Sequence, residues 1–227
     1  MLKWHGEKVM EIILSILDIL WKILLFLVIY ILAAKVVRRY IHFPAPPYAA
    51  YFLDSGLRLW MQPPGKLIQR SGISEGMTVL EIGCGNGAYT PFIGRAVGNN
   101  GIEHALDIQQ NMLDKLNSKL AKSKFKDVTN IRTVLGNAYE LPFEGHSIDI
   151  VCMITVLQEI PDRAKALKEV KRVLKSNGKL AITELFVDPD YPRQTTTVKT
   201  VTGASFKLHQ GQGDFWNYTV TFVPEGS

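Results

Sequence analysis

Apolar residues follow three different patterns along the 227-residue chain. They form one nearly continuous run at positions 12–34, and they come in short groups between prolines in residues 41–70. From residue 71 onward, short apolar runs alternate with amphipathic stretches, which is typical of strands alternating with helices. The patterns predict three parts, namely a helix in 1–40, a linker in 41–70 and an α/β domain in 71–227.

The first part has the length and composition of a membrane helix. Only Ser15, Asp18 and Lys22 interrupt the 23 residues from 12 to 34. At about 1.5 Å per residue this helix is long enough to cross a bilayer. Its first half carries a polar seam, because five residues fall within a sector of about 80° on a helix: Glu7, Glu11, Ser15, Asp18 and Lys22.

Two arrangements in a membrane fit this pattern. The helix either spans the bilayer at a tilt or lies partly in the membrane interface. Burial within an oligomer is a third possibility, whereas a cleaved signal peptide fits less well because no small-residue cleavage site follows the run. Lys35, Arg38 and Arg39 come directly after it, so the positive-inside rule predicts that the remaining chain is cytoplasmic.

Charge and cysteines limit the function classes. The net charge is +5, but residues 1–40 hold six basic and three acidic residues, which leaves 20 basic and 18 acidic residues elsewhere. The domain is therefore nearly balanced, which argues against a nucleic-acid partner. Cys84 and Cys152 are poorly placed for a disulfide, so a reducing compartment is the simpler interpretation.

The second part is a short apolar segment bracketed by prolines. Residues 48–61 lie between two proline groups, and prolines disfavour helix in the residue before them. This pattern predicts a turn, a short helix and another turn. The five prolines are Pro44, Pro46, Pro47, Pro63 and Pro64.

The third part predicts a mostly parallel sheet covered by helices on both faces. Strands are expected at 77–82, 102–106, 131–135, 147–154 and 179–186, and two more at 204–210 and 215–223. Helices are expected at 89–97, 109–124 and 162–174, and a weaker one, rich in threonine, at 192–202.

A glycine turn after the first strand is the strongest candidate binding site. Gly83, Gly85 and Gly87 are each separated by one residue and lie between the predicted strand and helix. Glycine allows the backbone to adopt positive φ and to approach a ligand closely. Asp107 ends the next strand about 20 residues on, where an acid can accept hydrogen bonds from ribose hydroxyls.

The sequence VLEIGCGNG at 79–87 resembles the first motif of class I S-adenosylmethionine (SAM) methyltransferases. Its spacing is G-x-G-x-G, with Glu81 two residues before Gly83. The chain is most similar to the ubiquinone and menaquinone biosynthesis methyltransferases, from about Pro44 to the C-terminus. This resemblance implies a Rossmann-like seven-stranded sheet that ends in an antiparallel hairpin. A dinucleotide-dependent dehydrogenase is the alternative that the glycine pattern leaves open.

The resemblance also implies how SAM is bound. The glycine turn would approach the amino acid portion of SAM, Glu81 would support the turn or reach that portion through water, and Asp107 would bind the ribose. The residues 136–138 stand where the family has Gly-Asp-Ala, so Asn137 replaces the acid that meets the adenine amine. Its amide oxygen can still accept a hydrogen bond. The full expected set is Glu81, Gly83, Cys84, Gly85, Gly87, Asp107, Ile108, Gln109, Met112, Asn137, Ala138 and Met153, and no metal is expected.

The catalytic group is less clearly indicated. Methyl transfer to oxygen or carbon needs removal of a proton. Glu184 and Asp188 are the favoured candidates because they lie near the end of the fifth strand, where an α/β sheet binds its ligand. His146, Glu159 and Tyr191 are alternatives. In the resembling family, the segment before the first motif covers the cofactor cleft, which here corresponds to 41–70.

These observations predict a membrane-anchored SAM methyltransferase acting on a hydrophobic acceptor. Tethering would raise the effective concentration at an acceptor dissolved in the bilayer, such as a prenylated quinone or aromatic precursor, or a lipid. An anchored methyltransferase for a soluble molecule is one alternative. A non-catalytic SAM-fold scaffold that self-associates through the N-terminal helix is another, because charged residues in a membrane helix usually face a partner.

Overall fold

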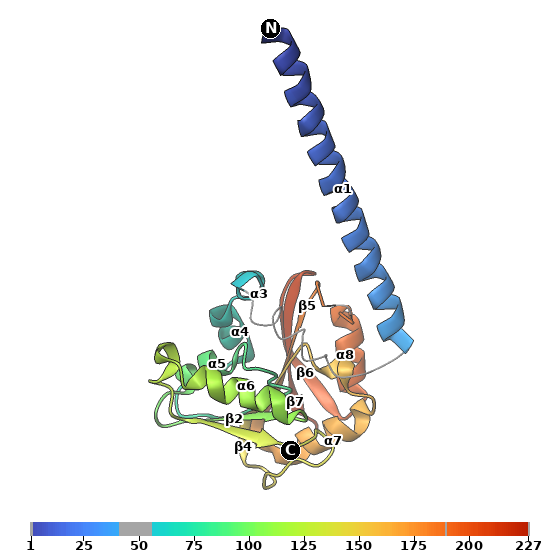
Figure 1. Cartoon of the computed structure of the whole chain (residues 1–227). Coiled ribbons are helices and arrows are strands. Elements are labelled where there is room, and N and C mark those ends of the chain that lie inside the picture. The colour runs from blue at the N-terminus through green and yellow to red at the C-terminus, as the bar shows by residue number, and fades with distance from the viewer. Residues whose placement is uncertain (1, 41–55, 189, 227) are drawn as a thin grey trace. The chain divides into compact units, whose positions relative to one another are not determined.

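The computed structural model describes residues 2–40, 56–188 and 190–226 (Figure 1). The chain forms two compact units, Met1–Ile41 and His42–Ser227, and each is described by itself. The predicted proline turn at 44–47 and the apolar residues 48–55 lie outside the described residues.

The first unit is one long helix, α1 (Leu2–Tyr40). Its segment Met10–Tyr30 has 21 residues and a mean hydropathy of 2.6, and none of the side chains described there is buried. By length and composition alone, this segment is a candidate membrane span. An exposed ion pair joins Lys22 Nζ to Asp18 Oδ2 at 2.6 Å, one helical turn apart within the apolar segment.

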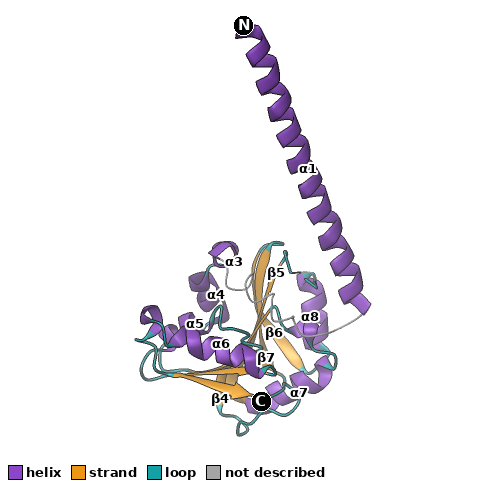
Figure 2. Ribbon diagram, viewed as in Figure 1, coloured by secondary structure: helices purple, strands orange, loops and turns teal. Residues whose placement is uncertain are grey.

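The second unit is built on a seven-stranded sheet with the order β3-β2-β1-β4-β5-β7-β6 (Figure 2). Neighbouring strands from β3 to β5 pair in parallel, whereas β7 is antiparallel to both β5 and β6. The predicted α/β class, the Rossmann-like sheet and the inserted antiparallel C-terminal strand are thereby confirmed. The strands are β1 (Thr78–Ile82), β2 (Ile102–Asp107), β3 (Ile131–Leu135), β4 (Ile148–Ile154), β5 (Leu174–Leu185), β6 (Phe206–Gly213) and β7 (Asn217–Pro224).

Helices cover both faces of this sheet. Successive residues of a strand point to opposite faces, so Leu80 of β1 packs with Leu167 on one face, whereas Val79 packs with Ile93 on the other. The first face is covered by α7 (Arg163–Val173) and α8 (Gln194–Thr202). The second face is covered by α4 (Pro64–Ser71), α5 (Thr90–Val97) and α6 (Gln110–Leu120), and a short helix α3 (Gly56–Met61) precedes α4.

Several predicted boundaries are shifted, and tertiary packing explains the two largest shifts. The helix expected to reach Lys124 ends at Leu120, because Phe125 turns inward to pack edge-on against Phe92 at a centroid distance of 6.1 Å. The fifth strand begins at Leu174 rather than at residue 179. Leu174 pairs with Ile148, and the register then shifts before Ile150 pairs with Lys179. Residues 175–178, which include the turn expected before the strand, lie within this irregularity.

Candidate functional site

The glycine turn joins β1 to α5 at the carboxyl end of the parallel strands. Gly83 has φ 73°, and a Cβ there would lie 2.6 Å from Val156 Cγ2, so packing requires this glycine. A Cβ on Gly87 would collide with Leu116 in the same way. Gly85 differs, because with φ 55° its Cβ would meet nothing within 4 Å. The backbone at Gly85 therefore faces open space that a ligand can occupy.

Asp107 holds this turn from the neighbouring strand. Its Oδ2 accepts a hydrogen bond from the backbone N–H of Gly85 at 2.8 Å, and its Oδ1 accepts one from Gln109 at 2.8 Å. Burial raises the pKa of Asp107, and the N–H groups of Gln109 and Gly85 partly offset that rise. Each carboxylate oxygen keeps a second lone pair, so Asp107 can orient the turn and still accept hydroxyl donors.

Glu81 lies beneath the turn, buried in β1. Its Oε2 accepts a hydrogen bond from the Thr90 hydroxyl at the first turn of α5, which links the strand to the helix across the glycines. Burial raises the pKa of Glu81 to about 7; the bond from Thr90 and the charge of Lys119 oppose that rise, and Asp107 adds to it. Of the two predicted roles, this contact corresponds to support of the turn.

Replacing Glu81 with glutamine is expected to flatten the pH dependence of stability. The pKa of Glu81 rises from 4.5 to about 7 on folding, so the native state binds the extra proton between these values. The contribution of Glu81 to the free energy of unfolding is thus fully present below pH 4.5. It is lost as the pH rises through 7, by about 3 kcal/mol in total. Glutamine has no proton to lose. Urea unfolding at about pH 5 and about pH 8 measures the difference.

The exposed residue Glu144 provides the matched control for this experiment. Its change to glutamine removes the same charge from a solvated position, so the difference in unfolding free energy between the two pH values should stay that of the wild type. An equal pH dependence in the wild type and in Glu81→Gln would contradict the assigned role of burial at Glu81.

Two exposed apolar side chains stand beside Asp107. Ile108 is 60% exposed and Leu135, at the end of β3, is 56% exposed. Asp107, which precedes Ile108, pairs with Leu135 in the register of β2 and β3. Ile108 and Leu135 therefore lie at the ends of neighbouring strands. Ile108 is among the predicted cofactor residues, and Leu135 is not. The signal that was available for Leu135 is an apolar residue ending a strand directly before Gly136.

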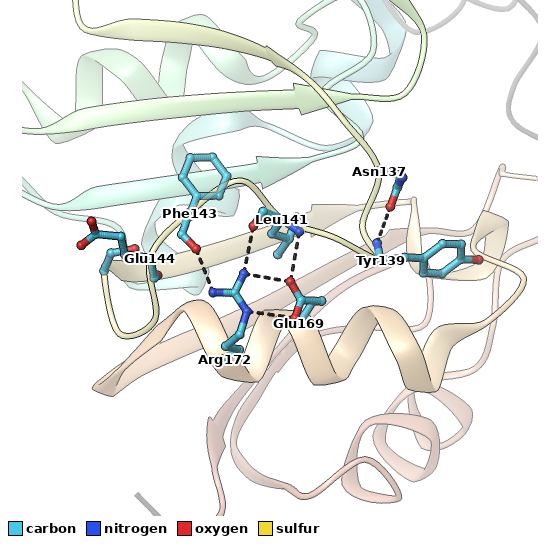
Figure 3. Close-up of polar contacts among 8 residues, drawn as sticks. Asn137, Tyr139, Leu141, Phe143, Glu144, Glu169 and Arg172 are labelled. Carbon is cyan, nitrogen blue, oxygen red and sulfur yellow. Dashed lines mark hydrogen bonds and ion pairs between the residues drawn. The ribbon is translucent and has the colours of Figure 1, made fainter.

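Asn137 begins the loop that follows β3. Its Oδ1 accepts a hydrogen bond from the backbone N–H of Tyr139 at 2.8 Å, as Figure 3 shows. The amide oxygen predicted to meet the adenine amine thus already has one partner, and a second lone pair remains. Ala138, the next predicted residue, is partly buried against the core.

An ion pair on α7 holds the rest of this loop. Arg172 Nη2 and Nε lie 2.8 and 2.9 Å from the two carboxylate oxygens of Glu169 (Figure 3). The same guanidinium donates to the carbonyl oxygens of Phe143 and Leu141 at 2.8 and 2.9 Å. These planar, bidentate contacts fix the loop after Asn137 to the helix.

Three of the predicted cofactor residues are packed beneath the site. Cys84, Met112 and Met153 are exposed by 5%, 2% and 0%. Burial raises the pKa of the Cys84 thiol well above its ordinary value, so the thiol stays protonated. All three are core side chains that present little surface to a ligand.

Arg58 of α3 was missed by sequence reasoning. It is 1% exposed, and its Nη1 lies 3.1 Å from Asp188 Oδ1 while its Nη2 donates to Thr155 Oγ1 at 2.8 Å. The guanidinium carbon also lies 5.9 Å from the centroid of the Tyr89 ring. The buried cation thus ties the segment before the first motif to the ends of β4 and β5. The only signal was a single arginine in an otherwise apolar short helix.

The two predicted catalytic carboxyls have different environments. Asp188 faces Arg58, whereas Glu184 is 2% exposed in β5, and its Oε1 has no hydrogen-bond partner among the described residues. Burial, with added repulsion from Asp188, raises the pKa of Glu184 well above its ordinary value. Burial thus favours the protonated form of Glu184, the form that can donate a hydrogen bond.

The alternative catalytic candidates lie apart from one another. His146 precedes β4 and contacts the carbonyl oxygen of Leu174, which places it at the amino end of the strands, opposite the glycine turn. Glu159 lies in a short 3-10 helix at the carboxyl end of β4. Tyr191 donates its hydroxyl to the carbonyl oxygen of Phe215. Among the described residues, no group of three or more His, Cys, Asp or Glu side chains could hold a metal ion.

The second unit is similar to known proteins in both sequence and fold. Residues 80–182 match the family described as a methyltransferase domain. The demethylmenaquinone methyltransferase of Staphylococcus aureus strain MRSA252 is 36% identical over 119 residues, which cover 52% of this chain and 47% of that protein. The chain thus spans about half the length of the curated relatives it matches.

Solved structures agree on the fold. A SAM-dependent methyltransferase from Aquifex aeolicus superposes with a TM-score of 0.72 at 24% identity, covering 79% of this chain and 99% of that one. A putative SAM-dependent methyltransferase from Methanococcus maripaludis gives a TM-score of 0.62 at 19% identity, with 80% and 91% covered.

Strand order, glycine turn and family match together define a class I SAM-dependent methyltransferase domain, and the class predicted from residues 79–87 is confirmed. SAM is the cofactor of this class. Within the class, the chain is similar in sequence to the staphylococcal demethylmenaquinone methyltransferase.

Proposed function

We propose that this protein transfers a methyl group from SAM to an apolar acceptor, with SAM held at the β1–α5 turn. The observation that carries the proposal is the open space at Gly85 beside Asp107, whose carboxylate keeps lone pairs for ribose hydroxyls. At Gly83 and Gly87, by contrast, neighbouring side chains occupy the space that a Cβ would need. The backbone at Gly85 is thus the part of the turn left open for the amino acid portion of SAM.

The remaining cofactor contacts follow from the side chains near Asp107. Ile108 and Leu135 offer exposed apolar surface on which an adenine ring can rest. Gln109 and Asn137 supply polar groups beside it, and Ala138 continues the same loop. Glu81, Cys84, Met112 and Met153 support these positions from below.

SAM, when bound, supplies an electrophilic methyl group on a sulfonium, so the protein has mainly to position the acceptor and remove its proton. We assign these tasks to the carboxyl end of β5. Asp188, opposite Arg58, is the candidate to take the proton. Glu184, whose pKa is raised by burial, is the candidate to donate a hydrogen bond to the acceptor.

The apolar acceptor is inferred from two further observations. The similar staphylococcal protein is a demethylmenaquinone methyltransferase, and α1 is apolar enough to hold this chain at a membrane. A prenylated quinone precursor in the bilayer satisfies both. Attachment would occur through residues 12–34, with the second unit on the cytoplasmic side, where Lys35, Arg38 and Arg39 favour it.

Methyl transfer can be tested with SAM labelled in its methyl group. The full chain, in bilayers that contain a demethylated quinone, is expected to move the label into the extracted quinone fraction. A water-soluble quinone analogue with the same ring is tested in parallel. If the acceptor must be apolar, the analogue should take up less label than the quinone in the bilayer. Label in neither fraction, from folded protein that binds SAM in calorimetry, would contradict the proposed activity.

A further inference from the structure

Four large apolar side chains are exposed at one end of the second unit. Leu57 and Trp60 of α3 are 57% and 76% exposed, and Phe215 and Trp216 in the β6–β7 turn are 58% and 55% exposed. We call these four residues the aromatic surface. Isolated exposed apolar residues are common, but a group of this kind usually marks an interaction site.

Hydrogen bonds hold the two segments of the aromatic surface together. Asn217 Nδ2, just after the turn, donates to the carbonyl oxygen of Met61 at 3.1 Å. Arg70 of α4 donates to the carbonyl oxygen of Asn217 at 3.3 Å. Figure 1 shows α3 and the tip of the hairpin at the same end of this unit.

The exposed rings of the turn are also held in place. The Phe186 ring lies 4.8 Å from both the Phe215 and the Trp216 rings, and its backbone N–H donates to the carbonyl oxygen of Trp216 at 2.8 Å. Asp214 Oδ1 accepts hydrogen bonds from the backbone N–H groups of Trp216 and Asn217 at 2.8 and 3.0 Å. The turn is therefore ordered in a way that keeps two aromatic side chains in solvent.

We propose that the aromatic surface inserts into the interfacial region of a lipid bilayer. Tryptophan favours this region because its ring is apolar and its N–H is polar, and leucine and phenylalanine add buried area. The chain itself supports a bilayer rather than another partner. Only the fifteen residues 41–55 separate α3 from α1. Fully extended, these fifteen residues reach about 50 Å, so they tether the aromatic surface near any membrane that holds α1.

The proposal extends the proposed function by naming the source of the acceptor, and that consequence rests on the proposed function. Arg58, which holds Asp188, lies between Leu57 and Trp60 in α3, and Phe186 lies two residues before Asp188. An acceptor that leaves the bilayer at the aromatic surface would thus arrive beside the candidate catalytic carboxyls.

Spin-label accessibility in the full chain tests the insertion without any need for turnover. Labels are placed by Trp216→Cys and Trp60→Cys. Glu144→Cys is the matched control, because Glu144 is exposed before β4, at the amino end of the parallel strands, whereas the β6–β7 turn lies at their carboxyl end. The native Cys84 and Cys152 are buried, and unmutated protein gives the labelling background. Each protein is reconstituted in phosphatidylcholine–phosphatidylglycerol vesicles at several lipid ratios.

We expect labels at 216 and 60 to lose several-fold in collisions with a water-soluble nickel chelate while gaining collisions with oxygen, relative to the label at 144. Equal accessibility at all three positions would overturn the proposal. So would protection from both reagents, which indicates cover by residues 41–55, and so would dipolar broadening at 216, which indicates a second copy. Calorimetry with SAM is done separately, and a failure there leaves the accessibility result standing.

Discussion

Replacing Arg58 with methionine is expected to lower the free energy of unfolding by about 3–5 kcal/mol, which is the usual cost of removing one partner of a buried ion pair. Arg58 is 1% exposed and its guanidinium contacts both Asp188 and Thr155. Methionine fills a similar volume but leaves the Asp188 carboxylate buried opposite an apolar side chain. Urea unfolding monitored by circular dichroism at neutral pH measures the loss.

The double variant Arg58→Met with Asp188→Asn shows whether the buried charge is the cause. Removing both charges is expected to recover most of the lost stability, because the penalty comes from a buried carboxylate that has lost its guanidinium and not from the missing contact. Arg95→Met is the matched control, since its pair with Asp127 is largely exposed and should contribute little to stability. Equal losses at positions 58 and 95 would contradict the buried pair.

The sheet was predictable because its strands are buried on both faces. Parallel strands between two layers of helices need apolar residues at most positions. β4 has them everywhere except at Asp149, and β1 has them at Val79, Leu80 and Ile82. In the sequence, the glycine turn is followed by a second strand that ends at Asp107. Because β1 and β2 are parallel neighbours, this order brings Asp107 beside Gly85. Local pattern alone thus indicated the glycine turn and Asp107, whereas Asn137 and the other candidate cofactor residues were predicted from the resemblance to the methyltransferase family.

The part of the site that depends on distant partners was not predictable. Arg58 and Asp188 are 130 residues apart, and no periodicity connects a short helix to a loop after β5. The exposed state of Phe215 and Trp216 was equally hidden, because the residues read as the start of a strand and the turn holds them outside it. Contacts between residues far apart in the sequence determine both features, whereas the pattern of apolar and polar residues indicates only local structure.

Replacing Asp107 with alanine is expected to weaken SAM binding by about 100-fold or more. A carboxylate that accepts two hydroxyl hydrogen bonds contributes about 1.5–3 kcal/mol for each, and every 1.4 kcal/mol is a factor of ten in affinity. The variant also loses the acceptor that orients the N–H of Gly85. Isothermal titration with SAM gives the affinity, and thermal unfolding of the same samples shows that the protein is folded. Asp127→Ala, at an exposed carboxylate, should bind as the wild type does.

Two glycine variants separate the open space at Gly85 from the stability of the turn. Gly85→Ala places a methyl group where nothing lies within 4 Å, so it should cost only about 1 kcal/mol of backbone strain while it obstructs SAM. Gly83→Ala brings its Cβ within 2.6 Å of Val156 and should chiefly lower the melting temperature. If Gly85→Ala binds SAM with wild-type affinity, the ligand does not approach the backbone there. The proposed position of SAM would then be wrong, even if Asp107→Ala had lost binding, because that loss would come from a disordered turn.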